Sequence, residues 1–487
     1  MEMVKYFETR RNPVSCVANR DKENYIVNNI QSSISKFPSR IAIETNEKLL
    51  TYSKLGELIK QYSYTLNKAC YGSLVGRHVL IYMDSPFEAM LTQLAILQNG
   101  AICVPLNRQT PLAYYSLEHM ANIACIVVDD YELQNQMNFP IVRILESESA
   151  ILLDEPECLP EALSYSEEYS YCIMTSGTTG TSKAIKLTQK AIINQIEAKI
   201  NVLEMDCNSR VCLSMNQSFV ASIWQVLATL FVGGTIIVLD NKTRLNPYDV
   251  FKKAENSKAS ILCVTPSFLR AFLLVNRGAR KISIKSLSKI VLTGEILHSE
   301  LVKKFYQDYD VQLINAYGQT ESADDTFHYI VPKDFEFESH PIIPIGYPIP
   351  YVNYIIDEGE LCISGRGVTS FRTGDLVSQR FDWSLVCHGR KDNQIKINGY
   401  RISPEAIEAC CTAIDGVADA LVVKVEVPAG AYLHLQYVLV EESEKVGIEE
   451  QYIAGILADS LPHYMMPSKI TRVTNIMYSS NGKKVRK

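Results

Sequence analysis

The stretch from Tyr171 to Lys183, which reads YCIMTSGTTGTSK, places the strongest constraint on this chain. Its first four residues are apolar and indicate a buried strand. The next seven are all Thr, Ser or Gly, and Ser182 and Lys183 follow. Small residues let a backbone approach an anion, hydroxyl and N–H groups donate to its oxygens, and a lysine adds positive charge. The segment predicts a strand, a phosphate-binding loop and then a helix, whose apolar positions are Ile192, Ile196, Ile200 and Leu203.

A different phosphate-binding loop, the P-loop of nucleoside triphosphatases, is excluded by the residues around Lys183. That motif requires Gly immediately before the lysine and Ser or Thr immediately after it. Here Ser182 precedes Lys183 and Ala184 follows it. A flexible surface loop rich in Gly and Thr remains the alternative when this segment is considered alone.

Length and composition limit the class of protein. The chain has 487 residues, too many for one ordinary core, so two or more domains are expected. Its 48 basic and 54 acidic residues give a net charge of −6 without a basic block, which makes nucleic acid an unexpected partner. The 13 cysteines include no CxxC pair, and the adjacent Cys410 and Cys411 suit packing positions. These features, with no apolar segment of signal-peptide or membrane-spanning length, predict a cytoplasmic protein that contacts no membrane.

Strand and helix patterns alternate over most of the chain, from about residue 40 to residue 350. Strands that alternate with helices predict an α/β fold with mainly parallel sheets covered by helices. The apolar runs are His78–Met83, Ala101–Pro105, Cys125–Val128, Thr235–Leu239, Ile261–Val264 and Ile290–Leu292.

The pattern changes after about residue 400 and predicts a small α+β domain. Pro404 suits the first turn of a helix that ends before Gly416. Two strand-like runs follow at Ala420–Val427 and Tyr432–Val440, and a second helix is expected at about Glu449–Leu461.

Two segments downstream of the loop suit a nucleotide. Asn315–Glu321 reads NAYGQTE. There Asn315 can pair with adenine and Tyr317 can stack on a purine. The carboxylate of Glu321, with Thr320 beside it, can hold Mg²⁺ near phosphates. In Phe371–Leu376, FRTGDL, Asp375 lies on a glycine turn and suits two neighbouring hydroxyl groups. Taken alone, either segment could be an ordinary turn.

These motifs, in this order, resemble those of the adenylate-forming superfamily: acyl-CoA synthetases, luciferases and adenylation domains of nonribosomal peptide synthetases. Thr175–Gly180 with Lys183 resembles TSGTTGxPKG, with Ser182 and Ala184 replacing Pro and Gly. NAYGQTE resembles NxYGPTE, with Gln319 replacing Pro, and FRTGDL resembles YRTGDL. Further matches are LQNGAICVP at Leu97–Pro105, GRKDNQIKINGYRI at Gly389–Ile402, LPHYMMP at Leu461–Pro467, and NGK at Asn481–Lys483 with Arg486.

The resemblance implies a fold, a reaction and roles for individual residues. It implies an adenylation core over residues 1–391 and a mobile domain over residues 392–487 that carries the catalytic Lys483, with Asp392 as the hinge and Lys396 on the hinge-side loop. Glu321 and Thr320 would act in catalysis, and Glu321 would bind Mg²⁺. The phosphates of ATP would contact Thr175, Ser176, Gly177, Thr178, Thr179, Gly180 and Lys183. The rest of the nucleotide would contact Gly294, Glu295, Asn315, Ala316, Tyr317, Asp375 and Arg390.

The implied reaction is activation of a carboxylic acid by Mg·ATP to an acyl-adenylate, followed by transfer to a thiol. The segment FVASIW at Phe219–Trp224 and the NGKKVR ending are most similar to peptide-synthetase adenylation domains. A freestanding enzyme that loads a separate carrier protein is therefore expected, and ligation to coenzyme A is the alternative. An inactive scaffold or a plain nucleotide switch is disfavoured because Lys483, Glu321 and Asp375 are all present.

The substrate pocket departs from the family pattern. Relatives that activate α-amino acids place Asp where this chain has Val220, and a buried ammonium without a partner is costly. An ordinary α-amino acid is therefore disfavoured, and a β- or ω-amino acid is expected if Asp324 or Asp325 faces the pocket. Both carboxylates could instead face solvent, in which case an aryl or hydroxy acid is the alternative. The resemblance implies a pocket formed by Phe219, Val220, Ala221, Trp224, Cys263, Val291, Thr293, Ala316, Asp324 and Asp325.

Overall fold

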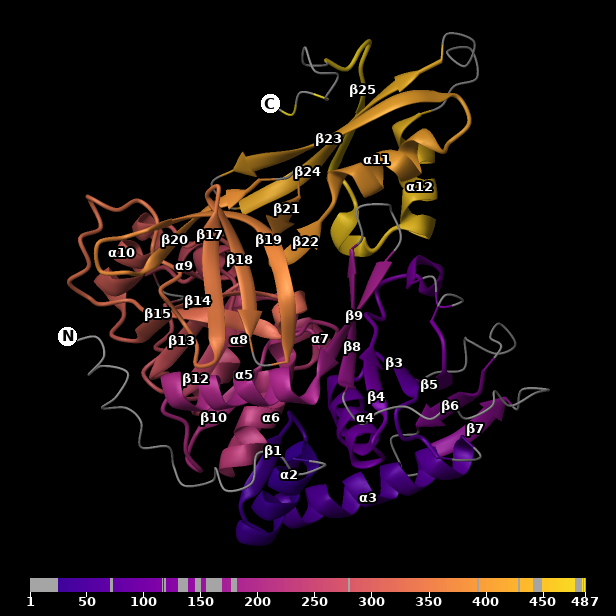
Figure 1. The fold of residues 1–487 in the computed structure, drawn as a ribbon, viewed down its shortest axis with the longest axis vertical. Coiled ribbons are helices and arrows are strands. Elements are labelled where there is room, and N and C mark those ends of the chain that lie inside the picture. Colours follow the sequence, from indigo (N-terminus) through magenta and orange to yellow (C-terminus); the bar gives the residue numbers. More distant parts are fainter. Residues whose placement is uncertain are drawn as a thin grey trace.

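The structure is a computed structural model (Figure 1). It describes residues 25–70, 73–115, 117, 120–129, 139–144, 150–154, 169–176, 182–278, 281–365, 367–391, 394–427, 430–440, 449–477, 484 and 486.

The first large sheet has nine strands, ordered β16-β15-β14-β13-β12-β10-β11-β1-β2, in the described part of the chain. Its central pairs are parallel, and only the pairs that involve β2, β15 and β16 are antiparallel. The strands are β1 (Ile41–Glu44), β2 (Leu49–Thr51), β10 (Arg210–Leu213), β11 (Thr235–Val238), β12 (Ile261–Val264), β13 (Lys289–Leu292), β14 (Gln312–Gln319), β15 (Asp324–Ile330) and β16 (Tyr347–Pro348).

The second large sheet has the order β7-β6-β5-β3-β4-β8-β9. Its inner pairs are parallel, and β7 and β9 are antiparallel edge strands. The strands are β3 (His78–Tyr82), β4 (Ile102–Pro105), β5 (Ile123–Val128), β6 (Ile141–Ile144), β7 (Ala150–Asp154), β8 (Tyr169–Ser176) and β9 (Ser182–Thr188).

Helices cover these sheets, as the alternating pattern predicts. The core helices are α2 (Tyr25–Lys36), α3 (Tyr52–Ala69), α4 (Pro86–Gln98), α5 (Gln189–Val202), α6 (Ala221–Val232), α7 (Asn241–Leu245), α8 (Pro247–Asn256), α9 (Pro266–Val275) and α10 (Ser299–Asp308), with short 3₁₀ turns η1 (Leu112–Tyr115) and η4 (Thr320–Ser322). One apolar cluster joins Val79 and Cys103 of the second sheet to Val211 and Ile236 of the first. The predicted α/β architecture with mainly parallel sheets is therefore confirmed.

A third sheet of four antiparallel strands lies against the first and was not predicted. It has the order β17-β18-β19-β20. Its strands are β17 (Val352–Asp357), β18 (Glu360–Gly365), β19 (Val368–Gln379) and β20 (Leu385–Arg390). Its apolar face packs on Tyr317 and Phe327 of the first sheet.

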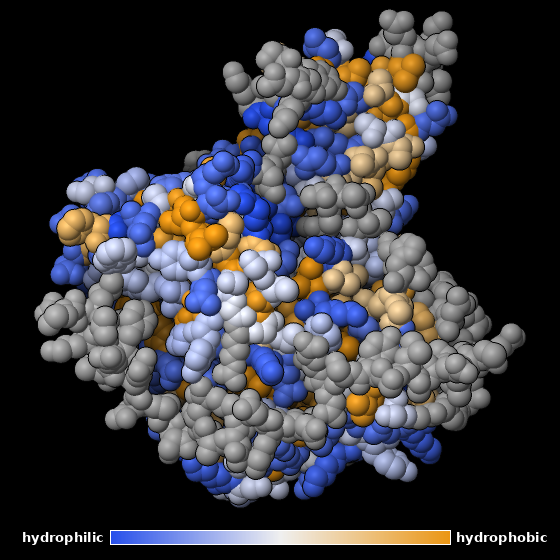
Figure 2. Space-filling view, in the orientation of Figure 1, coloured by the Kyte–Doolittle hydropathy of each residue, from blue (hydrophilic) through white to orange (hydrophobic). Residues whose placement is uncertain are grey.

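The C-terminal elements form a small α+β lobe that projects from the core (Figures 1 and 2). Its elements are β21 (Ile395–Ile397), β22 (Tyr400–Ile402), α11 (Pro404–Thr412), β23 (Val417–Val427), β24 (Gly430–Leu439), α12 (Glu450–Ser460), η6 (His463–Met465) and β25 (Lys469–Arg472). Figure 2 shows hydrophilic side chains gathered where this lobe meets the core. The hinge assigned to Asp392 lies outside the described residues, so the boundary between residues 391 and 392 stays a prediction.

Candidate functional site

A cavity of about 1130 Å³ lies between the two large sheets and the small lobe. Its wall includes the carboxyl ends of parallel strands, where ligands bind in open α/β sheets. Wall residues at these ends are Thr175 of β8, Ser214 after β10, Cys263 of β12 and Thr293 after β13. Several predicted residues from distant parts of the chain therefore meet at one place.

The predicted phosphate loop begins at the end of β8. Thr175 lines the cavity and pairs with Lys183 of β9, whose side chain is exposed. Ser176 ends β8, and Gly177, Thr178, Thr179 and Gly180 lie outside the described residues.

The expected order of strand, loop and helix was incomplete. A second strand, β9, intervenes before α5 begins at Gln189. The alternation of apolar Ile185 and Leu187 with polar Lys186 and Thr188 was the available strand signal, and the structure buries the two apolar side chains. The hydroxyl of Thr188 then caps α5 by accepting from the N–H of Ala191.

The NAYGQTE segment extends from β14 to the cavity. Gly318, Gln319 and Thr320 line the cavity. Asn315 is buried, and its amide nitrogen donates to the carbonyl oxygens of Ile343 and Pro344 at 3.2 and 2.8 Å. Ala316 is also buried. In this structure Asn315 holds a neighbouring loop, and its pairing with adenine stays a prediction.

Asp375 is the centre of a buried polar network beside the cavity. One of its carboxylate oxygens accepts from the Tyr317 hydroxyl at 2.6 Å and from the Gln319 amide at 2.7 Å. The Arg390 guanidinium lies 3.4 Å from the other oxygen. Arg390 and Gln319 line the cavity, whereas Asp375 lies behind them and is 3 % exposed.

A glycine allows Arg390 to reach this position. Gly374 has a φ of 74°, and a Cβ there would lie 2.6 Å from Nη2 of Arg390. A larger residue would therefore both strain the backbone and displace the guanidinium. The FRTGDL pattern thus has a local structural reason in addition to its proposed role with ribose.

Glu321, which the resemblance assigns to Mg²⁺, lies on η4 and is not among the described wall residues of the cavity. One carboxylate oxygen accepts from Arg401 of the small lobe at 3.1 Å, and the other is buried and has no hydrogen-bond partner among the described residues. A hard oxygen of this kind fits Mg²⁺, which protein sites commonly hold with one or two carboxylates plus substrate phosphates. Within the described ranges, no three His, Cys, Asp or Glu side chains are grouped so as to hold a metal by themselves.

Gly294 and Glu295, which were predicted to contact the nucleotide, contact the small lobe at Gly399. Glu295 accepts from the N–H of Ser267 at 2.9 Å and from the N–H of Gly399 at 3.1 Å. Gly294 lines the cavity, and a Cβ at this position would lie 3.3 Å from the Cα of Gly399. As a result, the loop around Lys396, Asn398 and Gly399 forms part of the cavity wall.

The predicted acid pocket occupies another part of the same cavity. Its wall contains Phe219, Val220, Ala221, Cys263, Thr293, Asp324 and Asp325. The other predicted members, Trp224, Val291 and Ala316, are buried in the core cluster that includes Val220 and are not among the described wall residues. Both carboxylates therefore face the cavity region, and neither is exposed to bulk solvent.

A buried lysine that the sequence interpretation did not identify contacts one of these carboxylates. Nζ of Lys199 on α5 lies 2.6 Å from Oδ2 of Asp325, and the two side chains are 0 % and 2 % exposed. The Thr293 hydroxyl donates to Oδ1 of Asp325 at 2.6 Å. The Lys199 ammonium also lies over the Trp224 ring at 5.2 Å. Lys199 falls three residues after Ile196 and seven after Ile192, on the predicted apolar face, and this position was the available signal.

Asp324 differs from its neighbour because its Oδ2 is buried and has no hydrogen-bond partner within the described part of the chain. Burial and the adjacent Asp325 raise the pKa of Asp324 to about 8, against the opposing effect of Lys199. Burial opposes the charged form of Lys199, yet the pKa of Lys199 is raised overall because Asp325 and Asp324 lie beside it. The three groups carry one net negative charge when all are ionised, and Asp324 is the carboxylate with an unsatisfied oxygen.

Lys483, the predicted catalytic lysine, lies outside the described residues. Its neighbours Lys484 and Arg486 contact α11 and β23 of the small lobe. No described residue of α11 or β23 lines the cavity. The described parts of the lobe that line the cavity are the β21–β22 hairpin, the start of β24 and the segment around η6, and the tail residues Lys484 and Arg486 are not among them.

No helix in the described part of the chain combines the length and apolarity needed to cross a membrane.

Comparison with known proteins identifies the family. Residues 30–371 match the AMP-binding enzyme family. Zwittermicin A synthase ZmaJ from Bacillus cereus is 25 % identical, over 94 % of this chain and 93 % of its own length. Tyrocidine synthase 3 from Brevibacillus parabrevis is 26 % identical over 94 % of this chain, which spans only 7 % of that synthase.

Solved structures share the fold. An artificially fused adenylation-PCP di-domain, NpsA-ThdA from Klebsiella oxytoca, superposes with a TM-score of 0.76 at 21 % identity, over 92 % of this chain and 93 % of that one. The amide bond synthetase McbA from Marinactinospora thermotolerans gives a TM-score of 0.80 at 19 % identity, over 94 % and 97 %. Because the family match covers more than half of the sequence, this chain belongs to the AMP-binding enzymes and is an adenylate-forming ligase.

Proposed function

We propose that this enzyme activates a β- or ω-amino acid with ATP and transfers the acyl group to the phosphopantetheine thiol of a carrier protein. In the first step a carboxylate oxygen forms a bond to the α-phosphorus, the bond to the β-phosphate oxygen breaks, and pyrophosphate leaves. In the second step a thiol sulfur bonds to the acyl carbon, the bond from that carbon to the phosphate oxygen breaks, AMP leaves, and the thiol proton passes to solvent. The observation that carries the proposal is the shared cavity, which Thr175, Thr320 and Arg390 line together with Asp324.

The protein contributes chiefly position and charge to this reaction. The phosphate loop, from Thr175 to Gly180, and Lys183 would hold the leaving phosphates. Arg390 and Asp375 would hold the ribose. Tyr317 is buried beside Asp375 and is not among the described wall residues, so its ring would stack on the base only after becoming accessible from the cavity. Mg²⁺ would be held by the unpartnered oxygen of Glu321 and would neutralise phosphate charge. Lys483 would stabilise charge on the carboxylate and α-phosphate during attack.

The acid pocket supports an amine placed away from the α-carbon. Val220, which stands before α6, offers no charge to an α-ammonium. Both oxygens of Asp325 are occupied by Lys199 and Thr293. Asp324 therefore remains as the acceptor for a substrate ammonium. An ionised Asp324 and the bound ammonium would form a pair, and each of these charges would be costly to bury alone.

An aryl or hydroxy acid is the alternative substrate. A protonated Asp324 could donate a hydrogen bond to a hydroxyl group, which its raised pKa permits near neutral pH. The Trp224 ring, however, is buried against Lys199 and is not in the described cavity wall. The Trp224 ring therefore gives no support to an aryl acid, although Phe219 remains as an aromatic side chain in the wall.

The choice of thiol acceptor rests on relatives and stays part of the proposal. The similar structure NpsA-ThdA is an adenylation-PCP fusion, and the curated relatives include peptide synthetases. Coenzyme A is the alternative acceptor. In the family the small lobe rotates between the two steps, and here its β21–β22 loop forms part of the cavity wall.

An ATP–pyrophosphate exchange assay with a panel of carboxylic acids tests the reaction and the substrate together. The panel contains standard α-amino acids, β- and ω-amino acids, aryl acids and hydroxy acids. We expect strong exchange with a β- or ω-amino acid. Exchange with none of the acids would reject the enzyme activity, and strong turnover of leucine or phenylalanine would reject the substrate assignment.

A further inference from the structure

We infer that Glu408 is a positioning residue, which anchors the tail that carries Lys483 to the small lobe. This inference rests on the proposed function, because it assigns Glu408 a part in the adenylation step through Lys483. Glu408 itself touches neither the cavity nor any group proposed to contact substrate.

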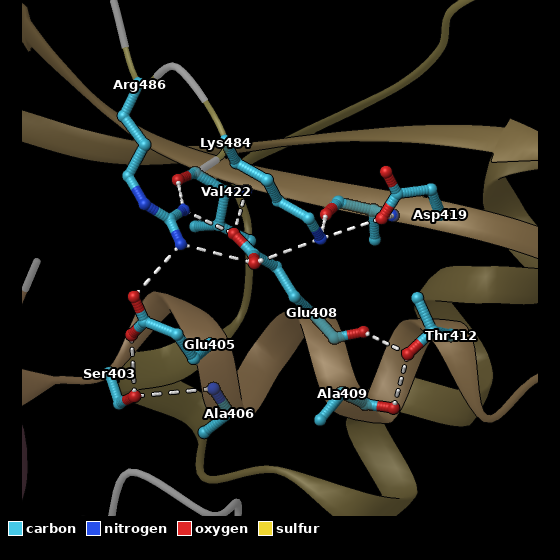
Figure 3. Close-up of polar contacts among 11 residues, drawn as sticks. Ser403, Glu405, Ala406, Glu408, Ala409, Thr412, Asp419, Val422, Lys484 and Arg486 are labelled. Carbon is cyan, nitrogen blue, oxygen red and sulfur yellow. Dashed lines mark hydrogen bonds and ion pairs between the residues drawn. The ribbon is translucent and has the colours of Figure 1, made fainter. Parts of the chain in front are cut away.

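The anchor is a buried carboxylate between α11, β23 and the tail (Figure 3). Glu408 is 5 % exposed. Its Oε1 accepts from the N–H of Val422 at 2.7 Å and from Nη1 of Arg486. Its Oε2 accepts from Nη2 of Arg486 at 3.2 Å and from Nζ of Lys484 at 3.5 Å. Arg486 thus binds the carboxylate through both terminal nitrogens, which is the geometry that most restricts an arginine.

Further contacts hold the same two tail residues. Nζ of Lys484 donates to the carbonyl oxygen of Ala420 at 2.6 Å and lies 2.7 Å from the Asp419 carboxylate. Nη2 of Arg486 donates to Glu405 at 3.0 Å. Among the described carboxylates, Glu408 contacts both basic residues. Its removal therefore weakens the attachment of Lys484 and of Arg486 at once.

All of these contacts lie within the small lobe. α11 and β23 pack on each other in one apolar cluster through Ile407, Cys411, Ala420 and Val422. If the lobe rotates between the adenylation and transfer steps, Glu408, Lys484 and Arg486 move together and their contacts persist. The tail then moves together with α11 and β23 and does not have to reach the active site as a flexible chain.

This matters because Lys483 directly precedes Lys484. Consecutive Cα atoms are separated by about 3.8 Å, so fixing Lys484 limits where the Lys483 backbone can lie. A catalytic group that is already held in place does not have to be ordered during the reaction, which avoids an entropic cost. Displacing such a group by about 1 Å can lower the rate about a hundredfold. The anchor would therefore restrict the positions open to Lys483 before ATP and acid meet.

The charge of the anchor also suits this role. Lys484 and Arg486 are paired with Glu405, Glu408 and Asp419. Their positive charges are satisfied locally and do not compete with Lys483 for phosphate oxygens. Among the described tail residues, Lys484 and Arg486 therefore leave the contact with the reacting groups to Lys483.

The first experiment measures the anchor without using activity. Limited trypsin digestion of the whole chain, followed by mass spectrometry, reports cleavage after Lys484 and Arg486. We expect Glu408→Gln to accelerate this cleavage at least about tenfold, because hydrogen bonds to a charged acceptor are lost. Glu426→Gln is the matched control, since Glu426 pairs with Lys424 on the exposed part of the same lobe. Equal cleavage in Glu408→Gln and wild type would overturn the anchor.

The second experiment measures positioning. Using the acid that gives the strongest exchange, we expect Glu408→Gln to lower kcat about tenfold or more while the KM for ATP stays within about twofold. Glu426→Gln should behave as wild type. In a Lys483→Ala background, Glu408→Gln should cause no further loss in single-turnover adenylate formation, because the residue acts through the absent lysine.

Other outcomes have distinct meanings. A further loss in the Lys483→Ala background, or a joint change in kcat and KM, would show that Glu408 only stabilises the lobe. If Glu408→Gln fails to fold, Arg486→Gln tests the same anchor from the tail side. Near-normal adenylation by Lys483→Ala would instead reject the proposed role of Lys483, and the trypsin result would still decide whether the anchor exists.

Discussion

Lys199 and Asp325 form a buried ion pair at the wall of the cavity, with Nζ and Oδ2 separated by 2.6 Å. The pair decides which carboxylate of the proposed acid pocket is free to bind a substrate, because Lys199 already neutralises Asp325. Asp324 keeps an unpartnered oxygen and faces the same cavity. The two aspartates are neighbours in sequence but should respond differently to substitution.

The first prediction concerns the stability of the ion pair. Lys199→Met should lower the free energy of unfolding by about 3–5 kcal/mol, because it leaves the Asp325 charge buried without its partner. The double variant Lys199→Met/Asp325→Asn should recover part of this loss. Urea unfolding of the four proteins in the cycle measures the coupling. Additive losses would show that the two groups do not depend on each other.

The second prediction separates substrate classes through Asp324. Asp324→Asn should raise the KM for a β- or ω-amino acid by at least about tenfold, because a desolvated ammonium loses its charge partner. Exchange with an aryl acid should change little. Asp308→Asn, which removes an exposed carboxylate paired with Lys281, is the control. An amine substrate that tolerates Asp324→Asn would require another group to bind its ammonium.

The third prediction is a pH dependence of substrate binding. Cys263, His328 and Lys199 should not change charge between pH 6 and 9. Burial raises the pKa of Cys263 and lowers the pKa of His328 well below its usual value, and the carboxylates beside Lys199 raise its pKa overall. The pKa of Asp324 is about 8. Its ionisation should therefore lower the KM for an amino acid as pH rises, approaching about tenfold per unit below pH 8. Asp324→Asn should show a flat profile.

The same titration affects stability with a definite sign. The native state holds a proton on Asp324 up to about pH 8, whereas the unfolded chain releases it near the ordinary value of 3.8. The stabilising contribution is complete below pH 3.8 and is lost as pH rises through 8. Thermal unfolding of wild type and Asp324→Asn across pH 6–9 checks this, since the variant should lose less stability over that range.

The fourth prediction tests the ribose site. Asp375→Asn should raise the KM for ATP by about tenfold or more, since each hydrogen bond to a charged acceptor contributes about 1.5–3 kcal/mol. It should also lower stability, because Asp375 accepts from Tyr317 and Gln319 inside the protein. Asp357→Asn, which affects an exposed ion pair with Arg372, is a control from the same sheet. An unchanged KM for ATP would restrict Asp375 to a structural role.

The fifth prediction tests the catalytic lysine. Lys483→Ala should lower adenylate formation by orders of magnitude, because an interaction made with developing charge in the transition state is lost. The free energy of unfolding should change little, as expected of a residue on a tail loop. Pyrophosphate exchange and urea unfolding measure the two effects. Near-normal exchange would exclude Lys483 as the catalytic group.

The local structure was largely predictable from the sequence. The apolar runs at His78–Met83, Ile261–Val264 and Ile290–Leu292 became β3, β12 and β13, because a buried strand needs only a short continuous apolar segment. Pro404 begins α11 as expected, since proline suits the first helical turn. The family motifs also placed Thr175, Thr320 and Arg390, which meet at one cavity. The strand β9 was missed because its short alternating pattern precedes a strong helical one.

The ionic partners were decided by the tertiary structure. Asp324 and Asp325 were equivalent in the sequence, and only the packing of α5 against β15 places Lys199, 126 positions away, on Asp325. Likewise, Glu295 accepts a hydrogen bond from Gly399 of the small lobe, and Glu408 accepts one from Arg486 of the basic tail. Residue type and periodicity determine which element forms and which face is buried. The distance between two charges on different elements depends on how those elements pack, and that packing is set by contacts throughout the folded chain.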